Sequence, residues 1–495
     1  MLEQVLSIQN LFLALLGVSA GIVFGAIPGM TATMAVAVFL PFTYAYELLP
    51  SLFLLIGLYV GGISGGLIPA ILINIPGTPS SIATCFDGYP MAKRGEGERA
   101  LKIGVTVSFI GGIFSLICLA LFTPPLANLA IKFSAVEKFL VILFAMTIIA
   151  ALSKDKILVG MFLSFLGVLI SLIGTFSDNN KLRLVPYELR KPMIYGFALL
   201  PVLIGLFALG QMFEEAEMGM KKDTTGEELL KSSTVKFSFS DLKGQLINII
   251  RSSALGTFVG ILPGVGGSAA SLLAYSQTKN FSKNPDEIGK GAIEGLIASE
   301  SANNGLTGGA LIPLLSMGIP GDSTTAVLIG AFTLHGMQIG PLFIRNNGDL
   351  WNGILIALLV CNIIMFLIMF FPIKFVSKLI YIPKQRLYPI IILMSIVGAY
   401  ACNYGVMFDV WSLIVFGVLG YLFIKLKLPA TCFLIGFILG RDLEKYFVDS
   451  LKGSSGNYSI FFTRGPICWV LWLMILASIV YALLPVKANR KAVST

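Results

Sequence analysis

Apolar stretches long enough to cross a lipid bilayer recur along the chain from Leu11 to Leu484, separated only by short polar segments. About 20 apolar residues in a helix span the roughly 30 Å hydrocarbon core of a bilayer. Clear examples are residues 103–121, 139–152, 157–173, 353–371 and 468–484. Because 56% of the residues are hydrophobic and 12% are charged, we expect no soluble globular domain. The sequence predicts an all-α polytopic membrane protein with roughly ten to fifteen crossings or half-crossings of the lipid bilayer.

Charge and cysteine usage argue against several other classes of protein. The net charge of +9 does not indicate nucleic-acid binding, because the basic residues lie in short turns between spans. The six cysteines lack any CxxC spacing and His335 is the only histidine, so we expect neither a disulfide framework nor a structural metal site. Ser64 lies in a GxSxG pattern, but no strand precedes it. An intramembrane hydrolase is therefore disfavoured, and we predict no catalytic residue and no cofactor.

Two distant parts of the chain share an unusual pattern. GAIPG at 25–29 matches GILPG at 260–264, and each lies well inside an apolar segment. GGLIP at 65–69 followed by IPG at 75–77 matches GGALIP at 308–313 followed by IPG at 319–321. The similarity extends more weakly through 137–167 and 386–417, so most of each half is predicted to be one copy of a repeat.

The repeat divides the chain into four predicted parts. These are a first transmembrane repeat at 1–211, a polar cytoplasmic linker at 212–247, a second transmembrane repeat at 248–440, and a loop, final transmembrane helix and basic cytoplasmic tail at 441–495.

The distribution of Lys and Arg between loops predicts that the two copies are inverted. The positive-inside rule places loops rich in Lys and Arg in the cytoplasm. One such loop follows the motifs of the first copy and carries Lys93, Arg94, Arg99 and Lys102. The other lies one span after the motifs of the second copy and carries Lys374, Lys378, Lys384 and Arg386. Residues 335–350 should then lie outside. The matched turns of the two copies agree with this inversion, because 154–156 is basic and 403–405 is uncharged. The N-terminus is predicted outside and the basic residues 487–491 inside. One predicted exterior loop disagrees, since it carries Lys181, Arg183, Arg190 and Lys191.

Pro-Gly pairs inside apolar segments interrupt helices, because proline lacks an amide donor and glycine tolerates positive φ. Such breaks are costly in lipid unless protein or a water-filled cavity covers them. Inverted-repeat transporters use them to place helix N-termini around an anion near the membrane midplane. Whether the segments cross as broken helices or return as re-entrant hairpins stays open.

Hydroxyl and amide side chains follow the breaks and predict a binding site for a small carboxylate. The predicted substrate-binding residues are Pro28, Gly29, Thr31, Asn74, Pro76, Gly77, Thr78, Ser80, Ser81, Pro263, Gly264, Gly266, Ser268, Asn303, Asn304, Pro320, Gly321, Ser323, Thr324 and Thr325. No Lys or Arg lies inside the motifs, so dipoles, hydroxyls and a coupling cation must compensate the charge. Asp322, Glu300 and Asp87 are predicted to bind that proton or cation, because an intramembrane carboxylate is costly and usually functional. For Asp322 the alternative is an N-cap of the helix that follows Pro320.

These motifs together resemble the large permease of the tripartite tricarboxylate transporters, and the resemblance covers nearly the whole chain. It rests on GAIPG at 25–29, IPGTP at 75–79, DGYP at 87–90, SESANN at 299–304, GALIP at 309–313 and GIPG at 318–321. The family pattern has a small residue where Asp322 stands, so its carboxylate is a departure.

The resemblance implies import of citrate-like di- and tricarboxylates across a prokaryotic cell membrane, driven by a Na⁺ or H⁺ gradient. It also implies two partners, a small membrane subunit of about four helices and an extracytoplasmic solute-binding protein. Two alternatives remain, a stand-alone secondary carrier for another organic anion or amino acid, and a passive channel.

Overall fold

A computed structural model of the chain describes residues 5–152, 157–175, 181–218, 235–382, 384–401 and 405–483. The predicted turns at 154–156 and 403–404, residues 219–234 of the predicted linker and the basic tail lie outside these ranges. Six described helices are long and apolar enough to cross a membrane, or seven if one bent pair forms a single span, and five shorter apolar helices accompany them. These findings confirm an all-α polytopic fold.

The first copy of the repeat is helical almost throughout. Its helices are α2 (Ile8–Ala26), α3 (Ala32–Phe39), α4 (Leu48–Gly65), α5 (Leu67–Ile73), α6 (Ile82–Met91), α7 (Gly97–Ile131), α8 (Ala135–Leu152) and α9 (Ile157–Ser171). Short 3-10 or π segments adjoin them at η1 (Leu40–Ala45), η2 (Pro79–Ser81) and η3 (Ala92–Glu96). The copies are then joined through β1 (Gly174–Thr175), β2 (Leu182–Arg183), η4 (Tyr187–Leu189), α10 (Leu199–Ile204), η5 (Gly205–Leu209) and α11 (Gly210–Met218).

The predicted second copy is also helical almost throughout. It contains η6 (Phe239–Leu242), α13 (Leu246–Ile261), α14 (Gly266–Phe281), α15 (Ile293–Met317), α16 (Ser323–Leu334), α17 (Phe343–Asn346), α18 (Gly348–Phe370), α19 (Ile373–Val376), η7 (Ser377–Tyr381), α20 (Lys384–Ala401) and α21 (Met407–Lys425). The chain ends with α22 (Ala430–Gly453), α23 (Ile460–Thr463) and α24 (Pro466–Leu483).

Two of these helices cross a boundary between the predicted parts of the chain. α11 continues past residue 211 into the predicted linker, where it packs on α21. α22 continues through 441–453, which the sequence predicted as a loop. The charged residues of this segment, such as Arg441 and Lys445, interrupt the apolar pattern because they line a cavity and do not face lipid.

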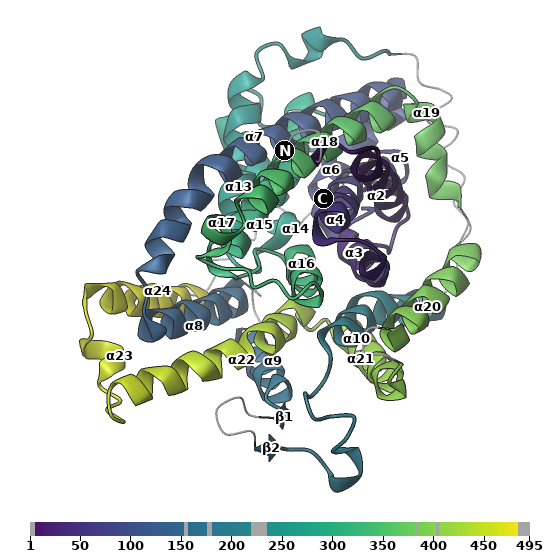
Figure 1. Cartoon of the computed structure of the whole chain (residues 1–495). Coiled ribbons are helices and arrows are strands. Elements are labelled where there is room, and N and C mark those ends of the chain that lie inside the picture. Colours follow the sequence, from purple (N-terminus) through teal and green to yellow (C-terminus); the bar gives the residue numbers. More distant parts are fainter. Residues whose placement is uncertain are drawn as a thin grey trace.

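Corresponding helices of the two copies exchange their packing partners. α7 packs on α15, and α18, the counterpart of α7, packs on α4. Likewise α14 packs on η2 and α6, while α3 packs on α16. Figure 1 shows α8, α9, α22 and α24 on one side of this central body, and α10, α20 and α21 on another. Each peripheral group therefore contains helices from both halves of the chain.

The contact registers fix the relative direction of the central helices. α7 and α15 run parallel, since Gly111 meets Ser301 and, further along both helices, Ser115 meets Gly308. α18 runs antiparallel to α7, since Phe109 stacks near Phe366 while Gly112 meets the earlier residue Asn362.

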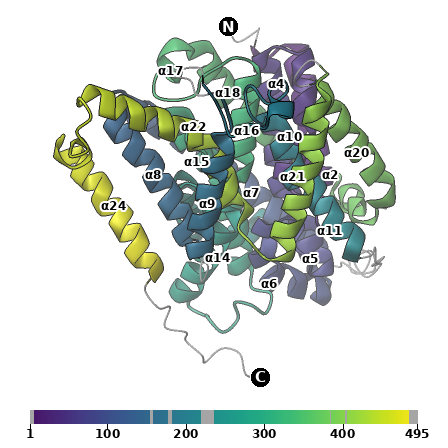
Figure 2. The ribbon, with the colours of Figure 1, turned by 90° about the horizontal axis from the view of Figure 1, so that it is seen from below.

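The same reasoning makes α18 parallel to α4, because Leu49 meets Gly353 and Phe53 meets Cys361. It follows that α4 and its counterpart α15 run in opposite directions. Figure 2 is consistent with these opposite directions, because α6, which follows α4 and α5, lies at one end of the molecule and α17, which follows α15 and α16, lies at the other.

The first Pro-Gly break of each copy turns the chain back. α2 and α4 lie parallel, since Gly17 meets Leu54 and Gly21 meets Leu58, so α3 and η1 must return between them. The second copy has the same register, with Gly256 on Ala302 and Gly260 on Leu306. Of the two possibilities left open by the sequence, these breaks form returning hairpins.

The loop that disagreed with the charge rule is partly neutralised. The Arg183 guanidinium donates to both carboxylate oxygens of Glu444, at 2.7 and 2.8 Å. At least one of its four cations is therefore paired. Because the positive-inside rule counts Lys and Arg and is not a net-charge rule, the disagreement of this loop with the predicted orientation stands.

Candidate functional site

The two second breaks, at IPG 75–77 and IPG 319–321, are built alike. α5 ends at Asn74 and α15 ends at Gly318, both in the left-handed conformation, and Ile75 and Ile319 donate backbone bonds to Pro69 and Pro313. Gly77 then lies against Gly25 and Gly66, as Gly321 lies against Gly260 and Ala310. A methyl group would not fit at either glycine, so both positions require close backbone approach.

A first polar cluster forms where the first copy's second break meets the second copy. It contains Thr78, Ser80, Ser81, Gly267 and Asn303. The Thr78 hydroxyl lies 2.9 Å from the Ser80 hydroxyl and 3.1 Å from that of Ser81. A methyl group at Gly267 would lie 2.5 Å from Ser80 Cβ and 3.1 Å from Asn303 Oδ1, so the start of α14 and the middle of α15 converge on this break.

A second polar cluster forms at the equivalent place in the second copy. It contains Thr33, Tyr59, Asp322, Thr324 and Thr325. Tyr59 donates to Asp322 Oδ2 at 2.6 Å, and the Thr33 and Thr324 hydroxyls lie 2.8 Å apart. Tyr59 and Asn303 are counterparts, since each lies ten residues before the proline of its GG…P motif. The two clusters meet where Ser64 donates to Asn304 Oδ1 at 2.7 Å.

The clusters differ in how their helix N-termini are satisfied. In the second cluster, Asp322 Oδ1 accepts from the Thr325 amide at 2.7 Å and the Asp322 amide donates to the Thr325 hydroxyl, which is a capping box. Thr31 caps α3 by accepting from the Met34 amide at 3.0 Å. In the first cluster, neither α14 nor the η2–α6 helix has a side-chain cap. Their first-turn amides therefore present uncompensated positive dipole ends.

Asn303 is the most informative residue of the first cluster. Its side chain is fully buried, yet neither its Nδ2 nor its Oδ1 has a hydrogen-bond partner among the described residues. Because a buried amide normally pairs with protein or a bound molecule, this arrangement indicates a place for a ligand. No carboxylate belongs to this cluster, whereas Asp322 supplies one to the second.

Glu300 lies one helical turn from Asn303 on α15 and is fully buried. Its Oε1 accepts from the Thr84 hydroxyl, and its Oε2 accepts from Ser108 at 3.1 Å. No Lys or Arg of the described chain forms an ion pair with it. The side-chain amide of Asn303 also lies beside this carboxylate. Because neutral donors do not compensate its charge, a carboxylate in this setting can exchange a proton or a cation.

Asp87, the third predicted coupling residue, has partners outside both clusters. Its Oδ1 accepts from the amides of Gly289, Gly291 and Ala292 at 2.7–2.9 Å, and Tyr275 donates to its Oδ2 at 2.8 Å. The carboxylate thus fastens the α14–α15 loop of the second copy to α6 of the first.

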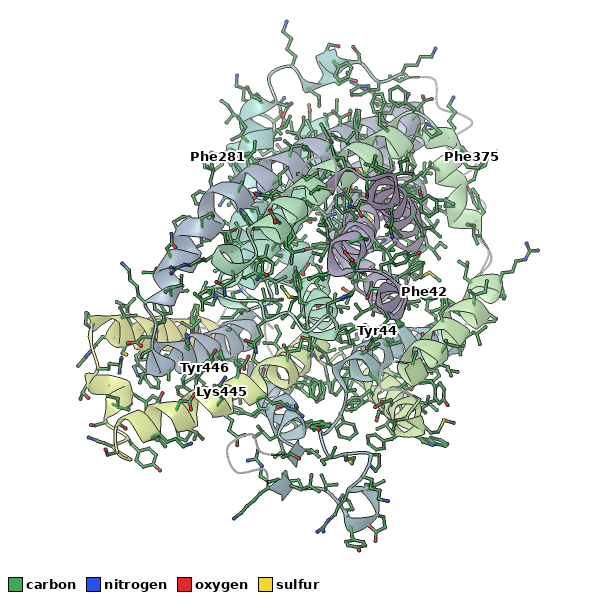
Figure 3. All side chains as sticks on the ribbon, in the orientation of Figure 1. Phe42, Tyr44, Phe281, Phe375, Lys445 and Tyr446 are labelled. Carbon is green, nitrogen blue, oxygen red and sulfur yellow. The ribbon has the colours of Figure 1, made fainter. Side chains whose placement is uncertain are left out.

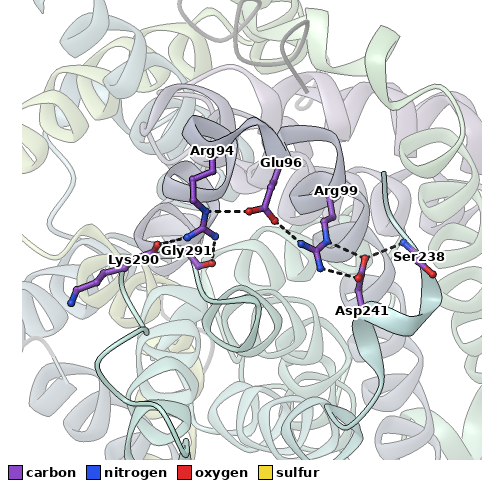
Figure 4. A network of polar contacts seen from close by, with 7 residues as sticks. All are labelled: Arg94, Glu96, Arg99, Ser238, Asp241, Lys290 and Gly291. Atoms are coloured by element: carbon purple, nitrogen blue, oxygen red, sulfur yellow. Dashed lines mark hydrogen bonds and ion pairs between the residues drawn. The ribbon is translucent and has the colours of Figure 1, made fainter. Parts of the chain in front are cut away.

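Arginines reinforce this end of the molecule (Figure 4). Arg94 donates to the carbonyl oxygens of Lys290 and Gly291 at 2.9 and 2.6 Å, and Arg99 pairs with Asp241 at 2.9 Å. The Arg99 guanidinium holds the pKa of Asp241 below its usual range. A depressed pKa of Asp241 adds to the stability of the folded state at pH values above the unfolded pKa of about 3.9. This contribution is lost in acid, as the pH falls through the lower pKa of folded Asp241.

The remaining predicted residues fall into three groups. Gly77, Pro263, Pro320 and Gly321 are buried at the breaks, and Pro28, Gly29, Pro76, Gly264, Gly266 and Ser268 are partly buried there. Ser323 lies 3.0 Å from the Thr431 hydroxyl on α22. Asn74 is exposed at the end of α5, away from the cluster contacts described above. Sequence reasoning missed Tyr59, Thr84 and Ser108; aligning the repeats would have found Tyr59 as the counterpart of Asn303.

Comparison with known proteins shows which family the chain belongs to. The model of the tripartite tricarboxylate transporter TctA family matches residues 11–435. The chain belongs to the TctA family. It is therefore a multi-pass membrane protein and the large membrane subunit of a tripartite tricarboxylate transporter, a kind of transporter that implies a small membrane subunit and a periplasmic binding protein.

Two relatives of this TctA-family chain come from Agrobacterium vitis. One is described as an uncharacterized 52.8 kDa protein in the TAR-I ttuC' 3' region, and it is 33% identical over 494 residues, covering 99% of this chain and 97% of the relative. The other is described as an uncharacterized protein in the TAR-II ttuC' 3' region, and it is 37% identical over 239 residues, 48% of this chain and 98% of the relative. No solved structure matches the chain.

Proposed function

We propose that this TctA-family chain imports citrate-like di- and tricarboxylates by Na⁺- or H⁺-coupled secondary transport. It works with a four-helix membrane subunit and an extracytoplasmic binding protein in a prokaryotic cell membrane. The opposite directions of α4 and α15 support an inverted repeat. The distribution of Lys and Arg between the loops supports an N-terminus outside and a C-terminus in the cytoplasm. No residue is assigned a catalytic role.

The observation that carries the proposal is the contrast between the two polar clusters. In the second cluster the carboxylate of Asp322 already accepts the amide of Thr325 and the hydroxyl of Tyr59. In the first cluster the equivalent acceptor position after IPG is held by Thr78, and the amide of Asn303 stays unpaired. We infer that a substrate carboxylate binds in the first cluster, where helix dipoles, hydroxyls and this amide stabilise it.

Coupling is assigned to Glu300. The carboxylates of Asp322 and Asp87 are satisfied as a helix cap and a loop anchor, which favours these structural roles over ion binding at both positions. Glu300 lies next to the proposed substrate position, and its polar neighbours, the hydroxyls of Thr84 and Ser108 and the side-chain amide of Asn303, are all neutral. We propose that it binds the coupling proton or Na⁺ while the substrate is bound.

The proposed site predicts that Asn303→Ala lowers citrate affinity without lowering stability. The variant removes a donor to the substrate, which corresponds to at least a tenfold loss, since a hydrogen bond to a charged group contributes about 1.5–3 kcal/mol. It removes one neutral neighbour of the Glu300 carboxylate, which keeps its hydrogen bonds from Thr84 and Ser108. Citrate binding and thermal unfolding of the purified protein measure both effects.

Two matched variants sharpen this test. Asn304→Ala removes the acceptor of the Ser64 hydroxyl, so it should lower the unfolding temperature. Asn303→Asp places a carboxylate in the first cluster, and like Asp322 it should occupy the anion position and prevent citrate binding. Wild-type citrate affinity in both Asn303 variants would contradict the proposed site.

A further inference from the structure

A cavity of about 670 Å³ lies beside the second break of the second copy. Met317, Gly318 and Ile319 form one part of its wall, immediately before Pro320. The remaining walls come from α8, α16, α22, the loop between α16 and α17, residues 195–199, and the ends of α7 and α9. The cavity therefore reaches the Pro-Gly break from the end of the molecule that carries α17 (Figure 2).

The cavity concentrates positive charge that the Pro-Gly motifs lack. Lys138 of α8 and Arg441 and Lys445 of α22 line it, against one carboxylate from Asp442. Figure 3 shows Lys445 and Tyr446 on α22, beside α8. Three cations and one anion leave a net positive cavity, which attracts multiply charged anions more strongly than singly charged ones.

Two of the cations are held in defined positions. Arg441 donates through Nε to the Ser171 carbonyl oxygen at 3.1 Å, and it also donates to that of Tyr195. The Lys138 ammonium lies 5.5 Å from the centre of the Tyr446 ring. Arg441 therefore also maintains the wall of the cavity, whereas Lys445 is exposed within it.

We propose that this cavity is an anion-capture site, where di- and tricarboxylates bind through Lys138, Arg441 and Lys445 before they reach the Pro-Gly breaks. The inference rests on the proposed function, which supplies the carboxylate substrate. It adds a second, cationic position that is separate from the uncharged first cluster. The capture site selects for charge, while the first cluster binds one carboxylate through neutral donors.

The test is carboxylate counterflow in vesicles that contain the chain and its small membrane subunit, with the binding protein present. The probes are citrate, succinate and acetate, which carry three, two and one carboxylate groups. The double variant Lys138→Gln/Lys445→Gln should raise the half-saturating citrate concentration roughly tenfold. Each partly solvated charge near the bound anion changes its affinity by a factor of a few, and the variant removes two such charges. The maximal rate should stay near that of the wild type, and the loss should decrease from citrate to acetate.

Two further variants serve as controls. Lys138→Arg/Lys445→Arg keeps the charge and should keep the wild-type citrate concentration dependence. Arg345→Gln removes an exposed cation of α17 that does not line the cavity, and it should have no effect.

An unchanged half-saturating concentration in the Gln double variant, or a loss confined to the maximal rate, would overturn the capture site while leaving carboxylate transport intact. Absence of carboxylate counterflow in the wild-type protein, together with absence of citrate binding, would instead overturn the proposed function and this inference with it.

Discussion

Gly77→Ala and Gly321→Ala are each expected to abolish citrate transport and to lower the stability of the purified protein by about 3 kcal/mol or more. A methyl group at Gly77 would overlap the Gly25 carbonyl oxygen and lie 2.7 Å from Gly66 Cα. At Gly321 it would overlap the Gly260 carbonyl oxygen and lie 2.5 Å from Ala310 Cα. The obstacles are backbone atoms, which cannot rotate away as a side chain does.

Gly348→Ala is the matched control, because nothing lies within 4 Å of the added methyl group and α18 begins at this residue. Alanine is a better helix former than glycine, so stability should be unchanged or slightly higher. Transport rates and thermal unfolding of the three variants give the comparison. Wild-type unfolding and transport in Gly77→Ala would show that the backbones do not approach as closely as described.

Glu300→Gln is expected to abolish ion-driven accumulation of citrate while citrate exchange across the membrane continues. Glutamine has the shape of a protonated glutamate, and the hydroxyls of Thr84 and Ser108 rotate to pair with its amide. The variant therefore keeps the fold but no longer titrates or carries the charge that attracts a cation. Coupled uptake needs that change of state, and exchange does not.

The control is Glu294→Gln, in the first turn of the same helix, where the carboxylate accepts from Ser282 near the loop. This variant should accumulate citrate as the wild type does. Accumulation by Glu300→Gln with an unchanged dependence on pH and Na⁺ would remove Glu300 from the coupling step.

The Pro-Gly breaks could be predicted from the sequence because each break depends on local residues, whereas the inverted repeat stays a prediction. Pro76 and Gly77 interrupt a helix wherever they stand, and the hydrophobic pattern around them is continuous.

The pairing of the clusters could not be predicted, because it joins residues far apart in the chain. Tyr59 meets Asp322 only because α4 of one copy packs near α16 of the other. Thr84 and Ser108 likewise reach Glu300 from separate helices. Neither contact has a local signal in the sequence.

The cationic cavity was missed for a different reason. Arg441, Asp442 and Lys445 lower the hydropathy of 441–453, so this part of α22 resembles a loop in a hydropathy profile. In the fold these charges face a cavity, where the cost of burying them in lipid does not arise.

The most direct test of the central claim is uptake of labelled citrate and related carboxylates into vesicles that hold this chain. Uptake is compared with and without a candidate small subunit and binding protein, under an imposed Na⁺ or H⁺ gradient. We predict accumulation against the citrate gradient only when both partners and one of the ion gradients are present. Accumulation by the chain alone would indicate a stand-alone carrier, and downhill flux that ignores both ions would indicate a channel; either result would contradict the account.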